Sequence, residues 1–115
     1  MGKVVIKQAD QASTVPFSAV EGSAAIGAVQ TKAVIQGADR PLLLWQHDMK
    51  AGAGLAFDKP NVGHVLYILA GAIEADGKTV EAGGTACVEH GAKADIRAVK
   101  DTVLYQSHER EPRHV

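Results

Sequence analysis

Short runs of β-branched and aliphatic residues alternate along the chain with Gly, Pro, Asp or Asn, about every eight to twelve residues. This spacing is typical of antiparallel strands in a sandwich or a barrel. No segment keeps the period of an amphipathic helix between recognisable caps, and the alanine-rich stretch 18–28 is interrupted by Gly22 and Gly27. The pattern therefore predicts an all-β protein.

The predicted strands cover Lys3–Gln8, Thr31–Gln36, Leu42–Met49, His64–Ala70, Ile73–Ala75, Lys78–Val80, Thr85–Val88, Asp95–Val99 and Thr102–His108. Asp76-Gly77 is a strong signal for a two-residue hairpin. The segment up to Pro16 is expected to be a polar edge, and residues 37–41 are expected to form a turn. Gly52 and Gly54 are expected to bend the chain into a loop over 57–63, and the residues after Arg110 to form a loose tail or a dimer arm.

Composition narrows the function classes. A chain of 115 residues with 46% hydrophobic and 22% charged residues fits one globular domain, residues 1–115. The net charge of -1 gives no electrostatic case for nucleic acid or an anionic membrane as a partner. The single cysteine, Cys87, excludes an internal disulfide, and no secretory signal or apolar membrane span is recognisable, so the expected location is the cytoplasm.

The segment from Gly52 to Gly71 resembles the first motif of the cupin superfamily, which runs glycine, five residues, His-x-His, three residues, glutamate, six residues, glycine. Both glycines and every interval are kept. Asp58 and Pro60 stand at the two histidine positions, and His64 stands at the glutamate position. The frame of a metal-binding barrel is therefore present with a different set of side chains.

The second cupin motif matches in its glycines, Gly83 and Gly91, while Glu89, Ala94 and Ala98 stand at its proline, histidine and asparagine positions. The resemblance covers 42–108 and leaves residues 1–30 as an N-terminal strand and edge segment and 110–115 as a tail. It implies a jelly-roll β-barrel with a small-molecule site in its mouth.

The resemblance implies a metal held by three histidines and one carboxylate, but Pro60 and Ala94 cannot ligate. No cofactor is therefore expected. An alternative is a rearranged site in which His47, Asp58 and His64 hold a divalent transition metal, as in non-haem iron oxygenases. The other interpretation of His47 is a strand residue that is hydrogen-bonded at the surface.

A site without metal would use acid–base chemistry. His64 would lie above an apolar wall of Leu66 and Ile68, with Asp58 holding it protonated. Such a pair suits a lyase or isomerase, and Tyr105 is a candidate for the complementary acid. Tyr105 could equally be an aromatic of the barrel wall, and His64 could be the remnant of a site that has lost catalysis.

Two further expectations concern ligands and partners. His90, in the loop before Gly91, is a candidate ligand-binding residue or a solvated loop histidine. The hypotheses are thus an enzyme acting on a small metabolite, a non-catalytic module that binds or senses a ligand, and a metal-dependent oxygenase. Small cupins commonly pair, so the resemblance also implies a homodimer, with Lys3–Gln8 as the strand exchanged or added across it.

Overall fold

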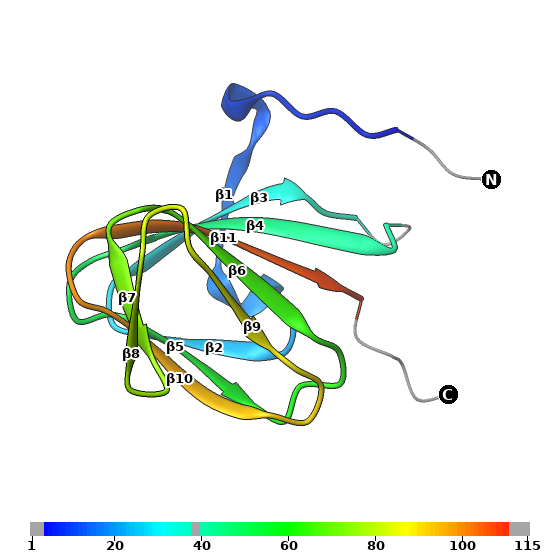
Figure 1. Ribbon diagram of the computed structural model, residues 1–115. Coiled ribbons are helices and arrows are strands. Elements are labelled where there is room, and N and C mark those ends of the chain that lie inside the picture. The colour runs from blue at the N-terminus through cyan, green and yellow to red at the C-terminus, as the bar shows by residue number, and fades with distance from the viewer. Residues whose placement is uncertain (1–3, 38–39, 111–115) are drawn as a thin grey trace.

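Two antiparallel sheets face each other in the computed structural model, which describes residues 4–37 and 40–110 (Figure 1). The six-stranded sheet runs in the order β1 (Ser13–Val15), β3 (Val29–Ile35), β4 (Leu42–Met49), β11 (Thr102–Glu109), β6 (His64–Ala70) and β9 (Thr85–Val88). The five-stranded sheet runs in the order β2 (Ser23–Ile26), β5 (Gly54–Asp58), β10 (Lys93–Ala98), β7 (Ala72–Ala75) and β8 (Lys78–Glu81). The only helical segments among the described residues are two short 3₁₀ turns, η1 (Ala9–Gln11) and η2 (Phe17–Ala19).

The predicted all-β jelly-roll class is confirmed, with one correction to its closure. In the described residues the sheets form two separate hydrogen-bonded ladders and do not close into a continuous barrel. Within this part of the chain no helix is long and apolar enough to cross a membrane.

Strict alternation along the central strands builds the core. On β4 the buried residues are Leu43, Trp45, His47 and Met49. A large apolar cluster fills the space between the sheets, and a smaller one around Trp45 lies under η2. Because side chains alternate across a strand, this burial pattern also fixes which residues face outward.

The strands with the clearest alternation lie where the sequence predicts them. Leu42–Met49, His64–Ala70 and Thr85–Val88 are confirmed at both ends. The hairpin is confirmed as well: Asp76 and Gly77 have φ of 52° and 74°, which suits the type I′ turn between β7 and β8.

Four predictions need correction or lie outside the described residues. Val4–Gln8 is not part of a strand in the single chain, and Lys3 is outside the described residues. β5 was predicted to be a bend and a loop, and neither β1 nor β2 was predicted. Of the predicted turn 37–41 and tail 110–115, residues 38–39 and 111–115 are outside the described residues.

Candidate functional site

A group of buried polar side chains lies on the inner face of the six-stranded sheet. Its members are Thr31, His47, His64, Gln106 and His108, each no more than 2% exposed. Alternation brings them inward from four strands, since β11 buries every second residue and pairs His108 directly with His64 on β6. The group lies beside apolar side chains, so its hydrogen bonds decide what its members can do.

Four of these side chains form one hydrogen-bonded chain. The Thr31 hydroxyl lies 2.8 Å from Nδ1 of His47, and Nε2 of His47 donates to Oε1 of Gln106 over 2.7 Å. The Gln106 amide nitrogen donates to Nδ1 of His64 over 3.0 Å and to the Ser23 hydroxyl over 3.2 Å. Since the Gln106 oxygen only accepts, His47 carries a proton on Nε2, and in the neutral ring Nδ1 accepts from the Thr31 hydroxyl.

A second pair completes the group. The indole N–H of Trp45 donates to Nε2 of His108 over 3.0 Å. Nδ1 of His108 donates to the Glu109 carbonyl oxygen over 2.7 Å. His64 and His108 thus each accept a hydrogen bond from an N–H group on one ring nitrogen, an arrangement that requires the neutral form.

Burial favours the same neutral form. Desolvation lowers the pKa of His47 from 6.5 to about 4, against the hydrogen bond to Gln106, which raises it. Desolvation, and then the charge of His108, lowers the pKa of His64 to about 4. The rings of Phe17 and Phe57 lie 5.0 and 5.2 Å from those of His47 and His64, and the rings of His64 and His108 are 4.4 Å apart. At neutral pH His47 and His64 are therefore hydrogen-bonding imidazoles without charge.

These hydrogen bonds do not suit a metal. In a neutral imidazole only the nitrogen without a proton can ligate, and Trp45, Gln106 and Thr31 already donate to that nitrogen in the three rings. Among the described residues no group of three or more His, Cys, Asp or Glu side chains is placed to hold a metal ion. The residues present therefore do not fit the metal that the cupin motif implies.

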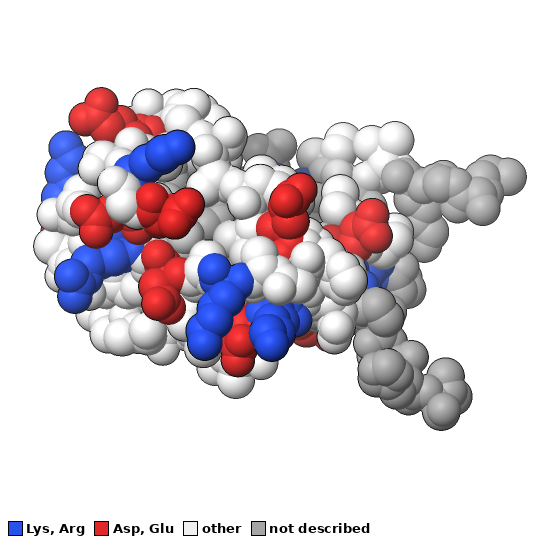
Figure 2. All heavy atoms as spheres, turned by 60° about the horizontal axis from the view of Figure 1, so that its bottom comes forward, with Lys and Arg blue, Asp and Glu red and all other residues white. Residues whose placement is uncertain are grey.

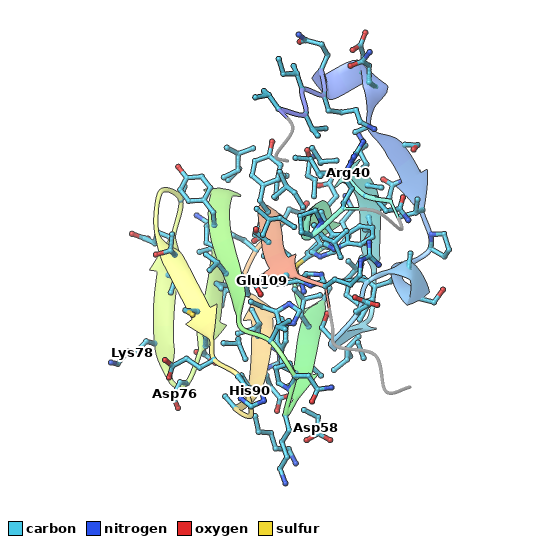
Figure 3. The ribbon with its side chains drawn as sticks, turned by 90° about the vertical axis from the view of Figure 1, so that its right-hand side faces the viewer. Arg40, Asp58, Asp76, Lys78, His90 and Glu109 are labelled. Atoms are coloured by element: carbon cyan, nitrogen blue, oxygen red, sulfur yellow. The ribbon has the colours of Figure 1, made fainter. Side chains whose placement is uncertain are left out.

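Asp58 lies elsewhere than the motif suggests. It is exposed at the end of β5, on the face opposite to the fully buried Phe57, and it is Phe57 that packs against His64. Figure 3 shows Asp58 and His90 at the end of the molecule, away from its centre. This placement corrects the expected His64–Asp58 pair and, with it, the triad of His47, Asp58 and His64.

Of the other candidate residues from the sequence, two lie together in the buried group and two lie at the surface. His47 and His64 come together through Gln106, as two of the predicted site residues. Tyr105 faces outward on β11, beside Tyr67 of β6, and His90 is exposed in the turn between β9 and β10.

Leu66 and Ile68 are fully buried, but they belong to the packed core rather than to a ligand wall. The physical reason is that the inward face of β6 packs in one cluster with apolar residues of the opposite sheet, among them Leu55, Phe57 and Ile73.

One cavity opens between β9 and β10. It has a volume of about 450 Å³, and it is lined by apolar side chains, Ala75, Ala86, Val88, Ala92, Ala94 and Ile96, together with Asp76, Cys87, Lys93 and Asp95. Val88 pairs with His64 across β6 and β9, and Ala94 pairs with Phe57 across β5 and β10. The cavity thus adjoins the ring pair Phe57–His64. A second cavity, of about 460 Å³, lies beside β2 and β5 and is lined by Ala24, Ala56 and Asp58 and by Ser23, whose hydroxyl accepts from Gln106.

Solved structures share this architecture over almost the whole chain. An RmlC-like cupin from Shewanella frigidimarina has a TM-score of 0.68 at 14% identity, covering 93% of this chain and 91% of that one. The cupin fold is the fold of this chain. KdgF from Halomonas sp. matches the cupin fold with a TM-score of 0.68 at 17% identity, over 96% of both chains. An acetylacetone dioxygenase from Acinetobacter johnsonii matches with a TM-score of 0.69 at 12% identity, over 95% of this chain and 74% of its own.

No family model and no curated protein sequence matches the chain. At these identities the structural likeness establishes the cupin fold, and the chemistry has to come from the site. Sequence reasoning missed Gln106, His108 and Thr31, which complete that site. The signal was available on the predicted strand Thr102–His108, where Gln106 and His108 alternate in phase with Leu104.

Proposed function

We propose that this cupin-fold protein binds a small, mainly apolar molecule with one polar group, in the cavity between β9 and β10. The observation that carries the proposal is the position of that cavity. Its wall includes Val88 and Ala94, the cross-strand neighbours of His64 and Phe57. A volume of about 450 Å³ is within the range of small-molecule sites, and few polar groups near an apolar wall suffice to orient a ligand.

In this proposal His64 recognises the polar group of the ligand. A histidine with a pKa of about 4 is neutral at pH 7, and it is a weak base there, since general bases work best with a pKa near the operating pH. Binding is therefore favoured over turnover. The second candidate is a metal-independent lyase or isomerase with His64 as its base, supported by the neutral form of this ring, which is the form that a general base needs before it takes a proton.

The test is a fragment screen by ligand-observed NMR, followed by titration of the variants Ala94→Leu and Ala24→Leu. Leucine at 94 fills the cavity and should weaken binding at least tenfold. Ala24 lines the second cavity, beside β2 and β5, so leucine there is the matched control and should change affinity less than twofold. The proposal is contradicted if none of the fragments binds, or if binding is lost in Ala24→Leu and kept in Ala94→Leu.

The same samples separate binding from catalysis. Each bound fragment is incubated with the wild type and with His64→Gln, which keeps a hydrogen-bonding side chain in place. New NMR signals that form with the wild type and not with the variant would support the acid–base candidate. Unchanged fragment spectra with both proteins, together with weaker binding to His64→Gln, would support the binding module.

We also propose that the protein acts as a homodimer in the cytoplasm. The single exposed cysteine, Cys87, agrees with a reducing compartment, because an exposed thiol persists there. The pairing is supported by the apolar side chains that the single chain leaves on its surface, among them Tyr67 and Leu69.

A further inference from the structure

The direction of each hydrogen bond at Gln106 follows from the groups that surround its amide. Gln106 is fully buried on β11, and its amide nitrogen lies 3.0 Å from Nδ1 of His64 and 3.2 Å from the Ser23 hydroxyl. Its amide oxygen lies 2.7 Å from Nε2 of His47. A side-chain amide has two N–H donors and one acceptor oxygen. This orientation therefore uses both donors, and the oxygen accepts from His47.

The reversed amide would suit the same neighbours less well. With nitrogen and oxygen exchanged, one N–H would face His47, and the oxygen would face both His64 and Ser23. The second N–H would then have no acceptor among the contacts that the described residues make with Gln106. A buried donor without an acceptor is costly, so the observed orientation is the favoured one.

This orientation fixes the tautomer of His64. Nδ1 of His64 accepts a hydrogen bond from Gln106, and burial keeps the ring neutral. In a neutral imidazole the nitrogen that accepts carries no proton, so the proton of His64 lies on Nε2. His64 is therefore an N–H donor on the edge of its ring that does not face Gln106. The lone pair of the ring lies at Nδ1, where Gln106 already donates to it.

The neighbours of His64 on the side of the cavity are apolar. The Phe57 ring lies 5.2 Å from the His64 ring, and Val88 is the direct neighbour of His64 on β9. Val88 also lines the cavity between β9 and β10, together with Ala94 and Ile96. In apolar surroundings a hydrogen bond is electrostatically stronger than it is in water. A ligand that enters from this cavity therefore gains most by bringing an acceptor to His64.

The charged residues of the cavity lie at its opening. Asp76, Lys93 and Asp95 line the cavity and are exposed. Figure 2 views the molecule from the side of β2, β5 and β10, where acidic and basic side chains are spread over the neighbouring surface. Two carboxylates and one ammonium give the opening an excess of negative charge. An anionic ligand is therefore disfavoured, and burying its charge against the apolar wall would add a further cost.

We infer that the ligand carries an uncharged acceptor, the carbonyl oxygen of a ketone or an ester, which takes the hydrogen bond that His64 donates from Nε2. This inference rests on the proposed binding function and names its ligand class. An alcohol of the same shape fits less well, because it must also bury its own O–H. The inference also separates the two candidate functions, since His64 could act as a base only after Nδ1 had lost its hydrogen bond from Gln106.

The tautomer can be measured directly on the full chain. Long-range proton–nitrogen correlation spectra of the histidine rings, with His64 assigned through His64→Gln, should show a protonated Nε2 and an unprotonated Nδ1 at pH 7. The exposed His90 is the internal control and should exchange between both tautomers. A proton on Nδ1 of His64 and none on Nε2 would overturn the inference, whatever the protein binds.

The ligand class is tested by ligand-observed NMR titration of two matched pairs, cyclohexanone with cyclohexanol and cyclopentanone with cyclopentanol. Each ketone should bind at least about tenfold more tightly than its alcohol and should shift the Nε2 signal of His64. Gln106→Leu releases the tautomer and should reduce this ratio to less than about threefold, whereas Gln46→Leu, on the outer side of β4, should keep it. If Gln106→Leu fails to fold, His64→Gln, whose amide offers both a donor and an acceptor, should show the same loss of preference.

The outcomes separate the ligand class from the binding function. Alcohols that bind as tightly as the ketones, and that Ala94→Leu excludes, would keep the binding function and overturn the ligand class. A ketone that binds without shifting the His64 signals would overturn the role of His64. If neither these molecules nor any screened fragment binds, while His64 shows the expected tautomer, the binding function itself is wrong and the ligand class is wrong with it.

Discussion

Lowering the pH from 7 to 4.5 should destabilise the fold through His47 and His64. Their folded-state pKa of about 4 lies below the value of 6.5 for the unfolded chain. Below pH 6.5 the unfolded chain therefore takes up more protons than the folded one. The stability contributed by the neutral imidazoles is complete above pH 6.5 and is lost as the pH falls toward 4.

The magnitude follows from the two pKa values. At 1.36 kcal/mol per pKa unit, each histidine should lower the free energy of unfolding by about 2.5 kcal/mol between pH 7 and pH 4.5. Both together approach about 5 kcal/mol, comparable with the whole stability of a marginal domain. Because both pKa values lie near 4, the two losses should occur in the same pH range.

The assay is urea unfolding followed by Trp45 fluorescence, at fixed protein concentration and at several pH values. The double variant His47→Gln/His64→Gln should be less stable at pH 7 but should lose much less stability between pH 7 and pH 4.5. His90→Gln removes an exposed imidazole and serves as the control. An equal loss of stability in the wild type and the double variant would refute the reasoning, since the titration would then lie in other groups.

Three other predictions can be measured on the same material. Gly71→Ala should lower the free energy of unfolding by at least about 2 kcal/mol more than Gly52→Ala. Both glycines have φ of 87°. A Cβ at 71 would lie 2.3 Å from the Asp101 carbonyl oxygen, whereas a Cβ at 52 would meet nothing within 4 Å. Equal unfolding free energies would show that the close approach at 71 relaxes freely. Gln106→Leu should lower the free energy of unfolding by about 3 kcal/mol, because it removes the hydrogen-bond partner of two buried imidazoles. The control Gln46→Leu, on the outer side of β4, should lower it by about 0.5 kcal/mol or less. A Gln106→Leu protein as stable as the wild type would mean that the hydrogen-bonded chain contributes little. Elemental mass spectrometry of tag-free protein, prepared without chelator, should find metal far below one ion per chain, and near-stoichiometric metal that survives dialysis would contradict the hydrogen-bond assignment of the histidines.

The strands that could be predicted are those whose alternation is uninterrupted. β4, β6 and β9 each alternate buried and exposed residues from the first position to the last, or nearly so. In β5 the buried residues Leu55 and Phe57 keep the same alternation. Gly52 and Gly54 favour a bend, so no strand was predicted there. Val4–Gln8 has the composition of a strand, and no partner in the described chain pairs with it. Propensity identifies a segment that can form a strand, whereas pairing decides whether it does.

The site was predictable in part for the same reason. Alternation on Leu42–Met49 left two interpretations of His47, an inward site residue or a residue hydrogen-bonded at the surface, and it lies inward and fully buried. Asp58 was taken from a motif position, and the alternation that places Phe57 inward directs it to the opposite face. Gln106 and His108 could have been found from alternation alone, but no motif position drew attention to them. In this chain the period of the strand was a better guide to the site than the ligand positions of the motif.

The buried polar group also explains how the fold keeps its strand register. A shift of one residue on β11 would turn Gln106 and His108 outward and bring Tyr105 and Ser107 into the core, leaving the acceptors and donors of His47 and Trp45 unsatisfied. An unsatisfied buried polar group costs about 1–3 kcal/mol, so the wrong register loses several kcal/mol while the apolar contacts change little in kind. A ligand in the cavity beside β9 would meet this same network through Val88 and His64. Its binding should therefore change the hydrogen bonds of His64 and, through Gln106, those of His47.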